Sequence, residues 1–348
     1  MLIRVNSWFN IFGGLMAKPK VGFYWCASCG GCEEAIIDLH EDILKVAELV
    51  DIVFWPCAMD FKTSDVKNIQ DNEITVCFIN GAIRTGEQEE MAKFLRKKAQ
   101  LIVSFGSCSQ LGGIPGLANF WDRESIFASS YGSKCPSVDN PDGVVPQELS
   151  EVPEGELTLP KFYNTVKTTD QVIDVDYYLP GCSPAPYLTM RAINTILSGD
   201  LPPKGTVLAP NKALCEVCSR NETKPEKLSL DKINRVSLVE IDPEKCFLAQ
   251  GIICMGPVTR SGCNGENDGR CITANMPCRG CYGPPSEVHD VGAKMIAALA
   301  SVVGLEGEED MNEADVQKLL DQIVDPAGLF YRFSLAKSYF RRKIMTDS

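Results

Sequence analysis

The sequence predicts an α/β protein: a doubly wound parallel sheet, followed by an irregular region of helices and loops. Three observations support this prediction. Short apolar segments alternate with amphipathic ones up to about residue 200, which is the pattern of parallel strands joined by crossover helices. The strand pattern is then lost, and eight of the 16 cysteines lie in the remaining third of the chain. Metal ligation by such cysteines can replace the apolar core as the source of stability.

Five apolar segments have the length and the endings of buried strands. They cover residues 20–25, 51–55, 74–79, 101–105 and 172–179, and most of them end at Gly or Pro. Between them, apolar residues recur at helical spacing, which predicts helices at residues 35–47, 87–98 and 185–197. Together these segments form a flavodoxin-like arrangement. Residues 111–170 are rich in Gly, Pro, Ser and Asp and are expected to form a long excursion.

The chain is expected to divide into three parts. Residues 1–17 read as an N-terminal extension, because MAKPKVGFYW from Met16 is a natural start directly before the first strand. Residues 18–200 are the predicted flavodoxin-like domain, and residues 201–348 the cysteine-rich domain. In the latter, helices are expected at residues 288–303 and 306–321, and residues 325–333 form an aromatic strip suited to a core or an interface.

Charge and composition restrict the possible functions. The formal net charge of -12 argues against nucleic-acid binding and against a basic membrane-surface patch. The sequence has no uninterrupted apolar run long enough for a membrane-spanning helix. It also has no cleavable signal peptide, so the cytoplasm is the expected location and disulfides are not expected. Clustered cysteines in that compartment indicate metal or redox chemistry.

Four cysteines of the first part each follow a predicted strand. Cys29 and Cys32 come after the first strand, Cys108 after the fourth and Cys182 after the fifth. Parallel strands end at one edge of the sheet, where open α/β sheets bind ligands. Isolated core cysteines would not all follow strand ends, so these four indicate one site. Neighbouring glycines permit tight turns and close backbone approach.

The eight cysteines of the second part suffice for two more four-ligand clusters. They are Cys215, Cys218, Cys246, Cys254, Cys263, Cys271, Cys278 and Cys281. A chain that holds three clusters is most simply an electron carrier. C-x-x-C pairs also bind zinc, but zinc gives no reason for cysteines at three strand ends.

In combination, these motifs resemble the small subunit of [NiFe] hydrogenases. The resemblance rests on Cys29-Gly-Gly-Cys32-Glu-Glu34, Gly106-Ser-Cys108, Pro180-Gly-Cys182-Ser-Pro and Met276-Pro-Cys-Arg-Gly-Cys-Tyr-Gly283. The cysteine-rich tail is most similar to the cytoplasmic branch, typified by the G subunit of the methyl-viologen-reducing, deazaflavin-non-reducing hydrogenase associated with heterodisulfide reductase. The resemblance covers about residues 18 to 340.

The resemblance implies three [4Fe-4S] clusters. It assigns the proximal cluster to Cys29, Cys32, Cys108 and Cys182, the medial cluster to Cys263, Cys271, Cys278 and Cys281, and the distal cluster to Cys215, Cys218, Cys246 and Cys254. Membrane-associated relatives have a histidine where this chain has Cys215, and often a proline near the position of Cys271. An all-cysteine set favours three four-iron clusters of low potential.

Several other residues receive weaker predictions. Glu34 resembles a family glutamate near the subunit interface and could pass protons; a carboxylate favoured at a helix N-terminus is the alternative. Cys26 and Cys57 are treated as non-ligands, although an alternative ligand set that includes them stays open. Cys77 is expected to be buried and Cys135 structural or free. His40 and His289 lie outside the cluster motifs.

The function implied by the resemblance is electron transfer within a cytoplasmic hydrogenase. The expected partners are a nickel–iron large subunit that holds the catalytic site, a small iron–sulfur acceptor subunit and a heterodisulfide-reductase-like complex that contains flavin. The alternatives are a subunit of the complex I or membrane-hydrogenase type, a zinc-binding scaffold, and a ferredoxin-like carrier, which the size and the sheet domain disfavour.

Overall fold

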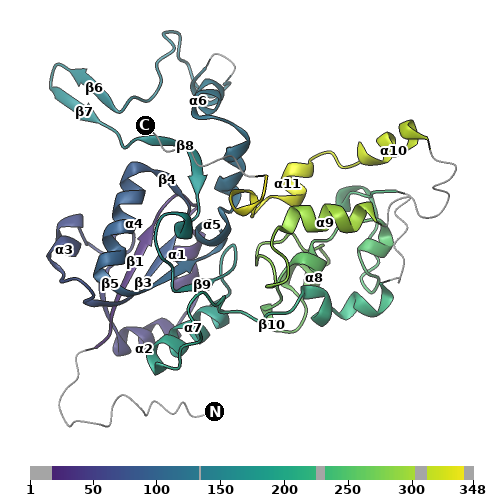
Figure 1. The fold of residues 1–348 in the computed structure, drawn as a ribbon, viewed down its shortest axis with the longest axis horizontal. Helices are drawn as coiled ribbons and strands as arrows, with labels where there is room; N and C mark the ends of the chain where they lie inside the picture. The colour runs from purple at the N-terminus through teal and green to yellow at the C-terminus, as the bar shows by residue number, and fades with distance from the viewer. Residues whose placement is uncertain (1–17, 133–134, 225–231, 302–311, 341–348) are drawn as a thin grey trace.

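A five-stranded parallel sheet forms the centre of the computed structural model (Figure 1), which describes residues 18–132, 135–224, 232–301 and 312–340. The strand order is β2-β1-β3-β5-β9, the order of flavodoxin-like doubly wound folds. The strands are β1 (Lys20–Trp25), β2 (Asp51–Phe54), β3 (Ile74–Asn80), β5 (Ala99–Phe105) and β9 (Tyr177–Leu179). The predicted fold class is therefore confirmed.

Helices cover both faces of the sheet. On one face, α1 (Gly31–Ile37) and α7 (Pro186–Ser198) bury Ile36 and Ile193 against Phe23 of β1. On the other face, α3 (Thr63–Asn68) and α4 (Gly86–Lys98) bury Val66 and Leu95 against Ile79 of β3. The apolar residues of the strands thus alternate between two separate cores, as the doubly wound pattern requires.

Two predicted elements are shorter than expected. The helix predicted at residues 35–47 is divided into α1 and α2 (Asp42–Leu49), because His40 between them adopts a left-handed conformation with φ 51°. The strand predicted at residues 172–179 is reduced to β9, which pairs with the last three residues of β5 and forms one bridge to Val207. Ile173 is instead buried in the core beneath α4 from a loop.

The predicted excursion contains regular structure. It comprises the 3₁₀ helix η1 (Ile114–Phe120), α6 (Arg123–Tyr131), a hairpin of β6 (Leu149–Val152) and β7 (Gly155–Thr158), and β8 (Phe162–Lys167). β8 pairs antiparallel with β4 (Ile83–Thr85), which directly follows β3. The hairpin extends away from the body of the molecule (Figure 1).

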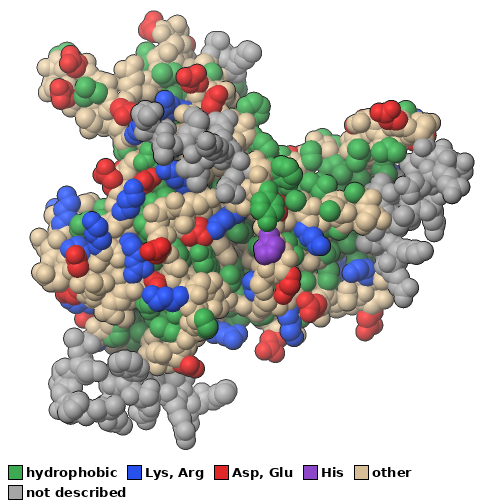
Figure 2. Space-filling model, viewed as in Figure 1, with side chains coloured by type: hydrophobic (Ala, Val, Ile, Leu, Met, Phe, Trp, Pro, Cys, Tyr) green, Lys and Arg blue, Asp and Glu red, His purple; other side chains and the backbone are tan. Residues whose placement is uncertain are grey.

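The cysteine-rich part consists of short helices and loops, as predicted, but it also has an apolar core of its own, which was not predicted. Its elements are η3 (Leu214–Val217), η4 (Ser219–Thr223), η5 (Val236–Leu238), η6 (Leu248–Gln250), η7 (Gly256–Val258), β10 (Cys263–Glu266), α8 (Arg270–Thr273), α9 (Val291–Ala300), α10 (Glu313–Leu320), α11 (Pro326–Phe330) and η9 (Leu335–Lys337). Phe330 and Tyr331 of the aromatic strip are buried in this core. Figure 2 shows further apolar side chains at the surface where this part meets the sheet domain.

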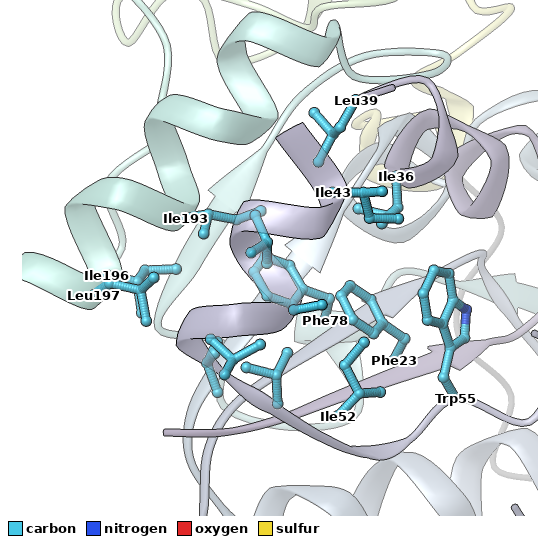
Figure 3. A pocket seen from close by; sticks show the side chains of 15 residues that line it. Phe23, Ile36, Leu39, Ile43, Ile52, Trp55, Phe78, Ile193, Ile196 and Leu197 are labelled. Carbon is cyan, nitrogen blue, oxygen red and sulfur yellow. The ribbon is translucent and has the colours of Figure 1, made fainter. Parts of the chain in front are cut away.

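An apolar cavity lies between the sheet and the helices α1, α2 and α7 (Figure 3). Phe23, Phe78 and Trp55 form its floor, with the ring centre of Phe23 4.7 Å from that of Trp55 and 5.2 Å from that of Phe78. No residue of α2 is fully buried. The α1–α2 side of this core is therefore packed more loosely than the α4 side.

No described helix is both long and apolar enough to cross a membrane. The N-terminal extension predicted at residues 1–17 lies outside the described residues, as do parts of the helices predicted at residues 288–303 and 306–321.

Asp176 fixes β9, whose far end leads to Cys182. Its Oδ2 accepts hydrogen bonds from the backbone N–H of Ile102 (2.8 Å) and from Arg96 Nη1 (2.6 Å), and its Oδ1 contacts Lys204 Nζ at 2.5 Å. Burial alone would raise the pKa of Asp176, but these three donors outweigh it and lower the pKa.

We expect Asp176→Asn to lower the free energy of unfolding by about 3 kcal/mol at pH 7, because Arg96 loses a largely buried partner. A depressed native pKa stabilises the fold above the unfolded value of about 3.9, so the difference should shrink as pH falls through the native pKa. Denaturant unfolding followed by circular dichroism measures both effects. The control Asp42→Asn, which breaks an exposed pair with Lys45, should cost less than about 1 kcal/mol.

Candidate functional site

The four cysteines predicted at the sheet edge lie together. Cys29 is in the loop after β1, Cys32 in α1, Cys108 in α5 (Ser107–Leu111) after β5, and Cys182 in the loop after β9. Cys32 and Cys108 are buried, whereas Cys29 and Cys182 are exposed. Burial raises the pKa of the Cys32 thiol, and the neighbouring Cys108, Cys182 and Cys29 raise it further. Burial, with further contributions from Cys182 and Cys29, raises the pKa of Cys108 to about 12.

Two glycines provide the space for these thiols. A Cβ atom on Gly106 would lie 2.4 Å from Cys32 Sγ, and one on Gly113 would lie 2.4 Å from Cys108 Sγ. Both glycines have positive φ, 86° and 56°, a conformation that other residues rarely adopt. Thus the backbone turns after β5 and after α5 let the thiols approach closely.

A second group of four cysteines surrounds one cavity in the cysteine-rich part. Cys215, Cys218, Cys246 and Cys254 line it together with Arg220, Phe247 and Ile272. Burial raises the pKa of Cys215 to about 12, and Cys254, Cys218 and Cys246 contribute in the same direction. A Cβ atom on Gly256 would lie 3.3 Å from Cys215 Sγ and 3.5 Å from Cys254 Sγ.

The third group lies between the other two. Burial raises the pKa of Cys281 to about 12, with further contributions from Cys263, Cys271 and Cys182 of the first group. Burial also raises the pKa of Cys278, and the charges of Cys254 in the second group and of Cys281 raise it further. The backbone N–H of Arg270 donates to Cys263 Sγ at 3.3 Å.

Hydrogen bonds connect the three groups directly. The thiol of Cys281 accepts a hydrogen bond from the backbone N–H of Cys182, and Ser107 Oγ donates to the carbonyl of Cys281. At the other side, the backbone N–H of Cys278 donates to Cys254 Sγ at 3.3 Å. The Cys278–Cys281 turn therefore contacts the first group at one end and the second group at the other.

The donor set fits iron–sulfur clusters. Each group gathers four thiols, with at least one buried thiol in each group, and they repel one another when ionised, so a positively charged metal centre is needed to hold them as thiolates. The second group encloses a cavity. In the described ranges, no three His, Cys, Asp or Glu side chains are close enough to share a single metal ion.

A buried carboxylate beside the first group was not predicted from the sequence. Glu33 is 5% exposed, and its side chain accepts hydrogen bonds from Trp55 Nε1 and Asn80 Nδ2. Burial raises the pKa of Glu33, while bonds from Trp55, Asn80 and the Cys57 thiol act in the opposite direction. Glu34, the predicted proton-transfer residue, is exposed on the same helix. The two glutamates are adjacent in sequence, and their positions on α1 determine that Glu33 faces the strand ends while Glu34 faces outward.

Arg220 was also not anticipated. It is 4% exposed, lies 4.3 Å above the ring centre of Phe247, and donates to Asn275 Oδ1 at 2.8 Å. Both Arg220 and Phe247 line the cavity of the second group. Arg220 thus places a positive charge beside thiols that are expected to be negative when a cluster is bound.

The remaining four cysteines belong to none of the three predicted ligand groups. Cys26 and Cys77 are buried together in the core on the α4 face, and the charge of Cys77 raises the pKa of Cys26 beyond the effect of burial. Cys57 is exposed and bonds to Glu33. Cys135 is half-buried. His40 and His289 are exposed.

Comparison with known proteins identifies the family. The chain is 37% identical over 328 residues to the iron–sulfur G subunit of the F420-non-reducing hydrogenase of Archaeoglobus profundus, covering 93% of this chain and 98% of that protein. It is 38% identical over 331 residues to the G subunit of the F420-non-reducing hydrogenase of Methanothermobacter thermautotrophicus, covering 95% and 98%. The chain belongs to the family of F420-non-reducing hydrogenase G subunits. The predicted resemblance is therefore confirmed.

Two further matches agree with this family. The family described as "NADH ubiquinone oxidoreductase, 20 Kd subunit" matches residues 29–196, which contain the first cysteine group. The solved [NiFeSe] hydrogenase of Desulfovibrio vulgaris Hildenborough shares the fold, with a TM-score of 0.50 and 15% identity over 78% of this chain and 95% of that one. The chain is therefore an electron-transfer subunit of a hydrogenase, an oxidoreductase. Homologous hydrogenase small subunits carry iron–sulfur clusters and pair with a large catalytic subunit.

Proposed function

We propose that the chain relays electrons from hydrogen oxidation in the nickel–iron large subunit, through three [4Fe-4S] clusters, to an iron–sulfur and flavin partner of the heterodisulfide-reductase type. The single observation that supports this most is the gathering of twelve cysteines into three groups of four that follow one another in space. The clusters would supply one-electron redox chemistry; the chain positions them, donates hydrogen bonds to their sulfurs and excludes water.

The proposed ligands of the proximal cluster are Cys29, Cys32, Cys108 and Cys182. Those of the medial cluster are Cys263, Cys271, Cys278 and Cys281, and those of the distal cluster are Cys215, Cys218, Cys246 and Cys254. Contacts between groups support this order. Cys281 touches Cys182, and Cys278 touches Cys254, so the Cys263 group is the middle one of the three. We include in this proposal the division into a sheet domain at residues 18–200 and a cluster domain at 201–348.

The exposed side of the proximal group supports a proposed interface with the large subunit. Large apolar side chains are exposed on elements next to these cysteines: Trp25 by 41%, Ile114 by 53% and Trp121 by 63%. Exposed apolar patches of this kind mark protein interfaces. The exposed Glu34 of α1 lies at the same sheet edge, which supports its proposed role in passing protons between the subunits.

Matches to F420-non-reducing hydrogenase subunits support the proposed exit of electrons to a small iron–sulfur acceptor and the proposed cytoplasmic location. They extend across the cysteine-rich part as well as the sheet domain. This extent disfavours the complex I alternative, whose related subunit carries a single cluster and lacks such a tail.

Metal analysis of anaerobically purified chain tests the proposal. Three four-iron clusters require about twelve irons and about twelve sulfides per chain. A preparation with about two zinc ions and no sulfide would instead establish the scaffold alternative. About four irons per chain would indicate a single cluster, as in the complex I alternative, and would contradict the three-cluster proposal.

A further inference from the structure

We propose that Ser107 and Tyr282 are positioning residues that fix the distance between the proximal and the medial cysteine groups, and with it the rate at which electrons pass between them. The inference rests on the proposed function, because it requires a cluster in each of the two groups. Neither side chain is among the proposed ligands, but each residue adjoins one: Ser107 precedes Cys108, and Tyr282 follows Cys281.

Ser107 joins the two groups through both its backbone and its side chain. It is the first residue of α5 and is 1% exposed. Its backbone N–H donates a hydrogen bond to the carbonyl of Gly181 at 2.7 Å, which holds the loop that carries Cys182. Its Oγ donates a hydrogen bond to the carbonyl of Cys281. This single buried residue therefore ties a ligand loop of the proximal group to a ligand of the medial group.

Tyr282 makes a second link between the same two groups. Its hydroxyl oxygen accepts a hydrogen bond from the backbone N–H of Ala185 at 3.0 Å. Ala185 lies three residues after Cys182 and directly before α7. Tyr282 is 3% exposed and belongs to the same apolar core as Leu188 of α7. The ring is therefore anchored in the sheet domain, although Tyr282 belongs to the cysteine-rich part of the chain.

The two links enclose a direct contact between proposed ligands. The backbone N–H of Cys182 donates a hydrogen bond to the thiol of Cys281. On the other side of Tyr282, a Cβ atom on Gly283 would lie 2.9 Å from Leu111 Cδ1 of α5, and Gly283 has a positive φ of 68°. The backbone of the cysteine-rich part thus approaches α5 as closely as a residue without a side chain permits.

Distance is the quantity that these contacts control. The rate of electron tunnelling falls steeply with the separation of donor and acceptor, and more steeply across a gap than along covalent and hydrogen bonds. Ser107 and Tyr282 act on the backbone at Cys281 and Ala185 through neutral hydroxyl groups. Removing these hydroxyls would loosen the contact between Cys182 and Cys281 while leaving every proposed ligand in the chain.

The experiment uses the anaerobically purified hydrogenase complex with the double variant Ser107→Ala, Tyr282→Phe. The magnetic interaction between two reduced clusters depends on their separation, so we expect electron paramagnetic resonance to show a weaker interaction between one pair. Reduction of the physiological acceptor by hydrogen should fall by at least about 10-fold, the smaller effect of losing groups that support a metal ligand. The iron content and the reduction of a dye that accepts electrons close to the large subunit should not change.

Tyr177→Phe is the matched control. Tyr177 is 2% exposed, belongs to the same apolar core as Tyr282, and donates one hydrogen bond, to the carbonyl of Pro202 at 2.9 Å. It lies at the end of β9 that is farther from Cys182. This variant loses a buried tyrosine hydroxyl without touching the contact between the groups, so the interaction and both reactions should remain as in the wild type.

An unchanged magnetic interaction or an unchanged rate in the double variant, at full iron content, would overturn the inference. An equal change in Tyr177→Phe would do the same, because it would reduce the effect to general loosening of the core. If the double variant loses iron, the two single variants are measured by the same readouts, and iron loss in both would show a role in assembling the ligands instead of spacing them. Failure of the proposed function is recognised separately, by fewer than about twelve irons per chain in the wild-type complex.

Discussion

Gly106→Ala is expected to abolish the proximal cluster while leaving the other two in place. The added Cβ atom would lie 2.4 Å from Cys32 Sγ, closer than packed atoms tolerate, and 3.3 Å from the carbonyl of Gly181, which is a tight contact. The positive φ of 86° adds backbone strain of about 1 kcal/mol. Because Cys32 is buried, its thiol has little room to move aside. Iron analysis should show the loss of about four irons per chain.

A matched glycine separates the steric effect from backbone strain. Gly205 has nearly the same φ, 88°, but a Cβ atom there would meet nothing within 4 Å. Gly205→Ala should therefore retain full iron content and cost about 1 kcal/mol of stability. Equal iron loss in both variants would show that strain alone, rather than contact with Cys32, disrupts the site. Full iron content in Gly106→Ala would contradict the assignment of Cys32.

Cys281→Ser is expected to interrupt electron transfer in the middle of the chain. Cys281 is held by the backbone N–H of Cys182 and by Ser107 Oγ, so it lies where the first and third groups meet. A serine hydroxyl ionises far less readily than a thiol and is a poor ligand for iron. We expect hydrogen-dependent reduction of the physiological acceptor to fall by at least about 100-fold, since changes to groups that merely support a metal ligand already cost about 10–100-fold.

The measurement compares the physiological acceptor with an artificial dye that accepts electrons close to the large subunit. In Cys281→Ser the dye reaction should persist, and the spectrum of one cluster should change. Cys135→Ser is the control, because Cys135 lies outside all three groups and should leave both reactions unchanged. Loss of the dye reaction as well would mean that Cys281 supports the fold or the subunit interface instead of the middle cluster.

The sheet and its site edge could be predicted because their signals are local. Strands β1, β3 and β5 are short apolar runs, and glycine follows β3 and β5 directly; parallel topology brings their ends together. For this reason Cys108 and Cys182 could be placed at that edge. The strand predicted at residues 172–179 was too long, because its apolar residues pack into the core from a loop, which periodicity alone does not distinguish.

The contacts that fix the site are not local and could not be read from the sequence. Glu33 and Glu34 are adjacent, and only the rotation of α1 against β2 and β3 decides that the first is buried. His40, which divides α1 from α2, adopts a left-handed conformation. Glycine is the residue that usually marks such a conformation in a sequence, and there is none at this position. Likewise, the bond from Cys278 to Cys254 depends on how two loops meet, although both cysteines were predicted as ligands.

The unequal exposure of the first cysteine group has a consequence for handling the protein. Cys32 and Cys108 are enclosed by this chain, but Cys29 and Cys182 are open on the outer side. The subunit alone therefore shields one half of that centre from dissolved oxygen, and its partner must supply the other half. We expect a chain produced without its large subunit to lose this cluster first in air, so co-expression is the condition under which a fully loaded protein can be obtained.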